Sequence, residues 1–208
     1  MLTTTQVLSF LFAALLITAS PGPDNLLVLS MGMSRGRWQG IAFGLGCALG
    51  CISHTLLAAL GVSALVAASP LAFSALKWLG GAYLVWLGVQ AWRAAGSSGP
   101  TVATSSQASL RALFFKGMLA NAINPKVVLF FLSFLPQFVV AEQGQVALQL
   151  GLLGLVFTAQ AAVLFASLGY FAGQIGAWLQ RRPRAGLWLD RVAGTVFIGL
   201  GLRMGLGR

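Results

Sequence analysis

Two residues with opposite formal charges lie in apolar segments that otherwise have the composition of membrane-spanning helices. Asp24 follows a Pro-Gly-Pro motif at 21–23, and Lys126 follows an Asn-Pro motif at 124–125. We place only these two formal charges well inside the membrane, where each costs roughly 2.5–3.5 kcal/mol on insertion scales. A carboxylate and an ammonium group at this depth indicate a site for a zwitterion, such as an amino acid. The alternative is that the two side chains neutralise each other as a structural ion pair.

The motifs before these charges interrupt the helices that carry them. Proline lacks a backbone donor, clashes with the preceding turn, and biases the residue before it away from helical angles. Unwound backbone inside a membrane is tolerated where it is buried in protein or lines a water-filled cavity. Helix breaks at matching points of two halves indicate a transporter's binding site, so the motif residues are candidates: Pro21, Gly22, Pro23, Asn124 and Pro125. The alternative is a pair of packing kinks without function.

Neutral polar residues near the motifs are further candidates for contacts with a substrate. Asn25, Asn121 and Gln160 can supply hydrogen bonds to a ligand, and they can equally join neighbouring helices. His54 can relay protons near neutral pH, although a hydrogen bond to another helix is the simpler role for a lone histidine. Both interpretations stay open at the level of the sequence.

The composition indicates the class of protein that must position these residues. The chain has 208 residues, of which 58% are apolar and 8% are charged, whereas soluble domains carry about 25% charged residues. So little charge excludes a soluble enzyme. The net charge of +10 would indicate nucleic-acid binding in a soluble protein. Here the basic residues lie mostly between apolar blocks, so we expect no nucleic-acid partner and predict one all-α domain of the bacterial inner membrane over residues 1–208.

The apolar segments predict six transmembrane helices joined mostly by short loops. Each has about the 20 residues that a bilayer requires, or more, and the predicted spans are 5–31, 40–66, 71–92, 113–138, 146–177 and 187–205. The N-terminal apolar stretch lacks the basic start of a secretory signal, so we interpret it as part of the first span. Residues 94–110 are rich in Gly, Ser and Thr, which predicts a flexible linker between halves 1–93 and 111–208.

Two pairs of similar segments indicate that these halves are repeats. Residues 17–30 resemble residues 120–133, and residues 80–88 resemble residues 193–201, in the same order in both halves. A unit with three helices begins and ends on opposite sides of the membrane. Its second copy therefore has the inverted orientation, and we predict two inverted three-helix repeats. Helices 1 and 4 then carry the Pro breaks at corresponding positions.

Basic residues are concentrated in alternate connections, and this asymmetry predicts the orientation. The first, third and fifth connections, with their flanks, contain no acidic residue and carry Arg35, Arg37, Arg93, Arg111, Lys116, Arg181, Arg182 and Arg184. The second and fourth connections contain no basic residue and one acidic residue, Glu142. The positive-inside rule therefore places the odd connections in the cytoplasm and both termini outside. We expect the same basic residues to contact anionic membrane lipids.

The second predicted span contains small residues that favour close helix packing. Glycines at 40 and 44, and at 46 and 50, allow another helix to approach, either within the chain or across a homodimer. Cys47 and Cys51 lie one turn apart, with poor geometry for a disulfide and no neighbouring metal ligands. We therefore interpret the cysteines as packing residues and expect neither a metal site nor a cofactor.

Three segments, 20–46, 77–93 and 114–138, resemble the LysE/RhtB family of bacterial amino-acid exporters. The Pro-Gly-Pro and Asn-Pro-Lys motifs are the most specific parts of a resemblance that extends over almost the whole chain. It implies a six-helix permease that exports amino acids such as threonine, homoserine, leucine or lysine and is driven by the proton gradient. It also implies that residues 21–24 and 124–126 belong to the functional motifs.

These sequence features discriminate between a secondary exporter, a metal-ion transporter, and a membrane enzyme or structural subunit. A secondary exporter accounts for the paired breaks, the repeated halves and the two opposite charges, with a small amino acid as substrate and protons as the coupling ion. A metal-ion transporter of similar architecture is the alternative, but the spans offer few metal ligands and Lys126 repels cations. A membrane enzyme requires a constellation of acid, base or nucleophile, and a structural subunit does not require matched breaks. We therefore predict a transporter and not an enzyme.

The predicted orientation is tested with topology reporters. An alkaline-phosphatase fusion at the C-terminus should be active and one after Arg111 should be inactive, because the disulfides of this reporter form only outside the cytoplasm. Phosphatase activity is normalised to the amount of each fusion in the membrane. Activity after Arg111 together with an inactive C-terminal fusion would reverse the orientation.

Overall fold

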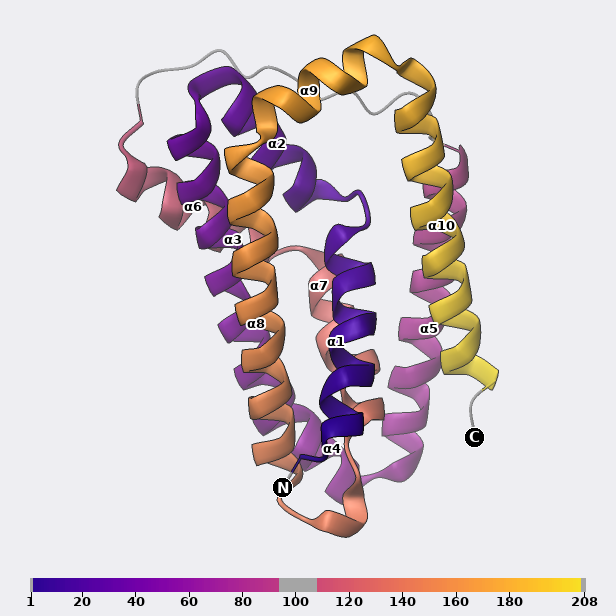
Figure 1. Ribbon diagram of the computed structural model, residues 1–208. Coiled ribbons are helices and arrows are strands. Elements are labelled where there is room, and N and C mark those ends of the chain that lie inside the picture. Colours follow the sequence, from indigo (N-terminus) through magenta and orange to yellow (C-terminus); the bar gives the residue numbers. More distant parts are fainter. Residues whose placement is uncertain (1, 94–107, 207–208) are drawn as a thin grey trace.

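All regular secondary structure is helical in the part of the chain that the computed structural model describes, residues 2–93 and 108–206 (Figure 1). Four helices are long and apolar enough to cross a membrane, and two bent pairs of helices bring the number to six when each pair is counted as one span. The prediction of an all-α membrane protein is therefore confirmed, and the six predicted spans equal the upper count. The predicted linker 94–110 lies outside the described residues except for its last three positions.

The first span is broken at the Pro-Gly-Pro motif, as predicted. It consists of α1 (Thr4–Ala19) and α2 (Pro23–Arg35), which meet at an angle of 58°. Gly22 between them has an extended backbone. Because Pro21 has no backbone N–H and restricts the residue before it, α1 cannot continue through the motif. The proline at 23 then occupies the first turn of α2, where a missing N–H costs nothing.

The fourth span is broken at the Asn-Pro motif, again as predicted. α6 (Leu110–Ala122) meets the remainder of the span at 52°. That remainder comprises three short helical segments, α7 (Pro125–Leu129), η2 (Phe130–Phe134) and η3 (Leu135–Phe138). Asn124 caps α7, since its Oδ1 accepts a hydrogen bond of 3.1 Å from the backbone N–H of Lys126.

The remaining spans have no such break. In chain order, with the short segments that join them, they are α3 (Arg37–Leu57), η1 (Ala58–Val62), α4 (Ser63–Ala68), α5 (Pro70–Arg93), η4 (Ala141–Gln143), α8 (Val146–Tyr170) and α10 (Pro183–Leu206). The span predicted over 146–177 was too long, because α8 ends at Tyr170 and a separate helix, α9 (Ala172–Arg181), follows. Figure 1 shows α9 crossing the end of the bundle between α8 and α10. Its apolar residues gather on one face, which is typical of an interfacial helix, and this apolar content made the boundary invisible in the sequence.

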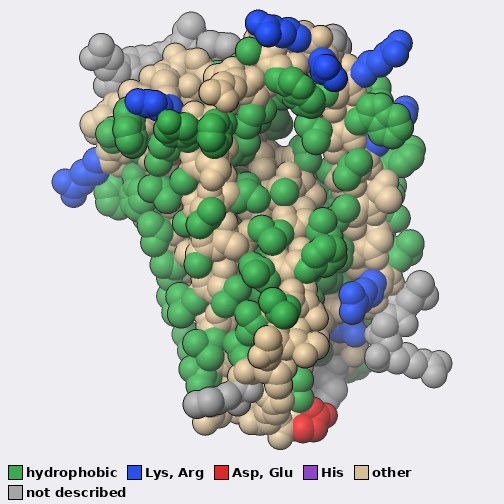
Figure 2. Space-filling model, in the orientation of Figure 1, with side chains coloured by type: hydrophobic (Ala, Val, Ile, Leu, Met, Phe, Trp, Pro, Cys, Tyr) green, Lys and Arg blue, Asp and Glu red, His purple; other side chains and the backbone are tan. Residues whose placement is uncertain are grey.

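The two ends of the bundle differ in charge. Figure 1 shows the N- and C-terminal ends of the chain away from α9, toward the opposite end of the bundle. Most Lys and Arg side chains on the face shown in Figure 2 lie near α9, and the acidic side chain on this face lies at the opposite end. This distribution agrees with the alternation from which the orientation was predicted, and the orientation itself stays a prediction.

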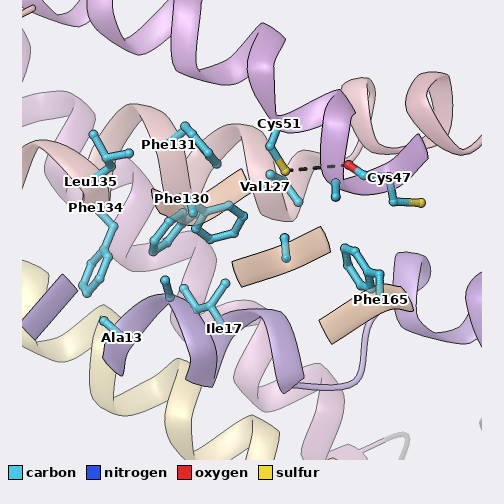
Figure 3. Close-up of a cluster of buried hydrophobic side chains, with 14 of the residues drawn as sticks. Ala13, Ile17, Cys47, Cys51, Val127, Phe130, Phe131, Phe134, Leu135 and Phe165 are labelled. Atoms are coloured by element: carbon cyan, nitrogen blue, oxygen red, sulfur yellow. Dashed lines mark hydrogen bonds between the residues drawn. The ribbon is translucent and has the colours of Figure 1, made fainter. Parts of the chain in front are cut away.

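The core of the bundle is aromatic and follows the second break. Phe130 and Phe131 are fully buried, and their rings contact that of Phe157 in α8 at centroid distances of 5.2 and 4.9 Å. Phe10 of α1 stacks on Phe130 at 6.3 Å. Figure 3 shows this group between α1, which contributes Ile17, and α3. Aromatic pairs of this kind contribute about 0.5–1.5 kcal/mol each beyond burial, so they fix η2 against α1 and α8.

Glycines bring α3 close to two other spans. Gly46 faces the backbone of Phe114 in α6, and Gly44 faces the backbone of Phe165 in α8. The glycines at 40 and 50 likewise face residues of α8 and α6. These four glycines were expected to mediate contacts either within the chain or in a homodimer, and the structure uses them within the chain. A homodimer through some other surface stays a prediction.

The fifth and tenth α-helices form a second closely packed pair. Gly81 of α5 faces the backbone carbonyl of Gly201 in α10, and Gly88 faces that of Gly194. α3 packs along α8 in the same way that α5 packs along α10. These pairs join the second span to the fifth and the third to the sixth. This pairing is compatible with an inverted repeat, and the repeat and its division into halves 1–93 and 111–208 stay predictions.

The packing of α3 on α6 is tested by adding one methyl group. Gly46→Ala should lower the free energy of unfolding by about 1–3 kcal/mol, because the new Cβ would meet the backbone carbonyl of Phe114. Gly151→Ala in α8 is the matched control, since no atom lies near that position. Unfolding is followed in detergent micelles. Equal stability of both variants would contradict the close contact of α3 and α6.

Candidate functional site

The two helix breaks lie beside each other and enclose a small cavity in the interior. The cavity has a volume of about 20 Å³, which is room for about one water molecule. Seven of the ten residues that the sequence predicted for the site line it, together with residues of α1, α3, α7 and α8: Ile17, Thr18, Gly22, Pro23, Asp24, Asn25, Cys51, Asn121, Asn124, Lys126, Val127, Phe157 and Phe165. We call this space the inner cavity.

Asp24 lies in the first turn of α2 and is buried, with 4% of its surface exposed. Its Oδ2 accepts a hydrogen bond of 2.7 Å from Nδ2 of Asn121. Its Oδ1 is also buried, and no hydrogen-bond partner for it exists among residues 2–93 and 108–206. A buried carboxylate oxygen without a donor is costly, and this cost points to a ligand or a proton as its missing partner.

Lys126 follows the second break and is buried, with 7% of its surface exposed. Its Nζ donates a hydrogen bond of 3.0 Å to the backbone carbonyl of Ser20, at the C-terminal end of α1. Cations are stabilised at this end of a helix, where carbonyl groups lack partners. The Nζ also lies 4.8 Å from the centre of the Phe197 ring in α10.

The two charged side chains have different hydrogen-bond partners. The Asp24 carboxylate is bonded to Asn121, and the Lys126 ammonium is bonded to the carbonyl of Ser20. Both side chains nevertheless line the inner cavity. Each charge is therefore held by a neutral group and faces a common space, and the alternative of a structural ion pair gains no support from these contacts.

Two of the neutral candidates, Asn25 and Gln160, form hydrogen bonds to Thr18. Asn25 joins the two parts of the first span, because its Nδ2 donates a 2.8 Å hydrogen bond to the carbonyl of Thr18. Gln160 of α8 donates a 2.8 Å bond to Oγ1 of Thr18. Gln160 does not line the inner cavity, but its buried Oε1 has no partner within the described chain. Thr18, which the sequence analysis did not select, is thus the point where α1, α2 and α8 meet.

Two of the motif prolines, Pro21 and Pro125, lie outside the inner cavity. Pro21 and Pro125 do not line the inner cavity, and both line a larger cleft between α2, α5 and α10. Gly22, Pro23 and Asn124 line both spaces. The backbone around the breaks therefore forms the wall between the inner cavity and this outer cleft.

The His54 side chain contacts the backbone of the second break. It is almost fully buried, and its Nε2 lies 3.1 Å from the carbonyl oxygen of Asn121, just before the second break. The Sγ of Cys51 donates a weak 3.4 Å hydrogen bond to Oδ1 of Asn121. His54 thus caps a carbonyl near the end of α6, which favours the simpler of the two roles considered for it.

The described residues contain no group of three or more His, Cys, Asp and Glu side chains that could hold a metal ion. Cys47 and Cys51 are free thiols, buried on α3. Lys126 adds a positive charge to the inner cavity. The alternative of a metal-ion transporter therefore gains no support from the donor set.

Further charged residues, outside the two motifs, also lie within the predicted spans. Asp190 and Arg191 lie in α10, and Lys77 lies in α5, all within predicted spans. Asp190 lines the outer cleft. The guanidinium of Arg191 lies 5.7 Å from the centre of the Trp92 ring. An acidic residue inside the last apolar segment was the available signal for Asp190.

The comparison with known protein families gives one match. The sequence model of the family described as LysE type translocator matches residues 15–208. A comparison with solved structures gives no match.

Curated relatives are similar over nearly the whole chain. A homoserine/homoserine lactone efflux protein of Salmonella typhimurium is 31% identical over 200 residues, covering 96% of each chain. An uncharacterized membrane protein of Vibrio cholerae is 33% identical over 195 residues, covering 94% of each chain. A leucine efflux protein of Salmonella typhimurium is 32% identical over 131 residues, covering 63% of this chain and 62% of the relative.

The hydrogen bond between Asp24 and Asn121 is tested with a double-mutant cycle. Because hydrogen bonds to charged groups contribute about 1.5–3 kcal/mol, the variant with both Asp24→Ala and Asn121→Ala should be that much more stable than the sum of the single changes predicts. The free energy of unfolding is measured in detergent micelles. Asn121→Ala combined with Gln160→Ala serves as the control, since these two side chains share no hydrogen bond. Strict additivity in the first cycle would contradict the bond.

Proposed function

Because the chain belongs to the LysE type translocator family, we propose that it is a secondary transporter that exports amino acids from the cytoplasm. It is a multi-pass protein of the bacterial membrane with up to six spans. The observation that carries the proposal is the meeting of two helix breaks at a buried carboxylate and a buried ammonium group that are not bonded to each other. This arrangement favours a carrier for a zwitterion over an enzyme or a metal transporter.

The two charges fit the two ends of an amino acid. The substrate ammonium binds Oδ1 of Asp24, which has no hydrogen-bond partner among the described residues. The substrate carboxylate binds Nζ of Lys126 and replaces the carbonyl of Ser20 as its partner. Asn25 and Asn121 line the same cavity and supply neutral hydrogen bonds around these contacts, and Gln160 supports the cavity wall through Thr18. The site therefore recognises the groups that all α-amino acids share.

The size of the inner cavity indicates what must move. A volume of about 20 Å³ does not accommodate an amino acid. Binding therefore requires the segments at the two breaks to separate, and the Lys126 side chain must leave the Ser20 carbonyl. In a carrier built from two inverted halves, such a rearrangement opens the site to one side of the membrane and then to the other.

Coupling to the proton gradient requires a group that exchanges a proton for substrate. Asp24 is the candidate, because its carboxylate has one hydrogen bond and one oxygen without a partner. A proton on Oδ1 and a substrate ammonium at Oδ1 exclude each other. Alternate occupation of this atom on the two sides of the membrane exchanges protons moving inward for amino acids moving outward.

Flux measurements in proteoliposomes test the function. Purified protein should exchange labelled homoserine, threonine, leucine or lysine, and an imposed pH gradient should drive accumulation that a protonophore abolishes. Protein-free liposomes give the background. Exchange that is insensitive to the pH gradient would contradict proton coupling, and a complete lack of flux across this panel would contradict the export of these amino acids.

Substitutions at the two charges accompany this assay. Asp24→Asn and Lys126→Gln should each lower flux by about tenfold or more, which corresponds to about 1.4 kcal/mol of lost binding. Because no ion pair joins the two residues, combining the changes should not restore flux. Lys116→Gln and Glu142→Gln are matched controls on exposed positions and should retain flux. Export at the parental rate by the double variant, at equal abundance, would overturn the assignment.

A further inference from the structure

A cleft much larger than the inner cavity leads from the helix breaks toward the α9 end of the bundle. It has a volume of about 570 Å³ and is lined by α2, by α5 with Tyr83 and Gln90, and by α10 with Asp190 and Phe197. Figure 2 shows a hollow in the surface below α9 and beside the upper half of α10. This outer cleft is large enough for an amino acid, and the inner cavity is not.

Only a thin boundary separates the two spaces. Gly22, Pro23, Asn124 and Lys126 line both of them. Of these, Lys126 is the one long side chain, and it crosses the boundary beside Gly22, where an added Cβ would lie 3.0 Å from the Nζ. The absence of a side chain at Gly22 thus makes room for the ammonium group at this boundary.

The Lys126 ammonium has two contacts, one in the broken first span and one in α10. On one side it donates to the Ser20 carbonyl at the end of α1. On the other side it lies 4.8 Å from the centre of the Phe197 ring, and Phe197 is 3% exposed. A cation over an aromatic face is attracted to it, more strongly where water is excluded. Phe197 belongs to the α5–α10 pair, so this contact connects that pair to the broken spans.

We propose that the outer cleft is the access route to the substrate site from the α9 end, and that Phe197 is the positioning residue that holds Lys126 closed across it. The inference rests on the proposed function, because the site it guards is the amino-acid site. Displacement of α10 carries the Phe197 ring away from the Lys126 ammonium. The ammonium is then held only by its hydrogen bond to the Ser20 carbonyl, which is easier to break. A substrate carboxylate arriving through the cleft then takes the ammonium as its partner.

The chain contains a natural reporter for this gate. Cys51 lines the inner cavity, is fully buried and does not line the outer cleft. In a Cys47→Ala background it is the only thiol, since the sequence has two cysteines. The rate at which 2-aminoethyl methanethiosulfonate, a small ammonium reagent, modifies Cys51 measures access to the inner cavity without any transport. The reagent is added to one side of sealed vesicles, with free cysteine as scavenger on the other.

Phe197→Leu keeps an apolar side chain and removes the aromatic face. Loss of the cation–π contact should raise the rate of Cys51 modification from the α9 side by roughly fivefold to tenfold. Phe197→Tyr keeps the ring and should retain the slow rate. Phe43→Leu, which changes an equally buried phenylalanine outside both cavities, is the control for general loosening of the core.

The outcomes separate the gate from the transport function. An unchanged rate in Phe197→Leu, or an equal increase in Phe43→Leu or Phe197→Tyr, would overturn the gate. If Cys51 becomes accessible only in Phe197→Leu but the parent moves no amino acid in proteoliposomes, the gate is supported and the proposed function fails. If the parent transports amino acids and Cys51 access is the same in all variants, the function stands and the gate fails.

Discussion

Carbonyl groups released by a broken helix have no water to bind inside a membrane, and the interior of this protein is arranged around supplying them with donors. The Ser20 carbonyl receives the ammonium of Lys126, the Thr18 carbonyl receives the amide of Asn25, and the Asn121 carbonyl receives the imidazole of His54. The groups that make the breaks tolerable are therefore the same groups that line or surround the candidate site.

These partners are exchanged between the two breaks. The first break exposes the carbonyl of Ser20, and the second break supplies Lys126 to it. The second break in turn supplies Asn121 to the carboxylate of Asp24, beside the first. Because each break depends on the other for a partner, neither can rearrange alone. A ligand that disturbs one contact therefore acts on both breaks, which is the coupling that the proposed transport requires.

The sequence was sufficient for features that depend on local chemistry. Proline positions predicted both breaks, and the rarity of charge in apolar segments singled out Asp24 and Lys126, which are both buried. It was insufficient where the answer depends on how helices are rotated about their axes. The partners of the two charges, the contact between Lys126 and Phe197, and the role of Thr18 all depend on such rotations. The turn after Tyr170 was missed for another reason, because an apolar sequence continues on both sides of it.

The size of the inner cavity also matters for proton leakage across the membrane. With a volume of about 20 Å³ it holds about one water molecule, and the buried rings of Phe130 and Phe131 pack in the adjoining core. One water does not form a chain of hydrogen bonds along which protons could leak. In this conformation the inner cavity therefore offers no water chain along which protons could cross, as the proposed gradient-driven export requires.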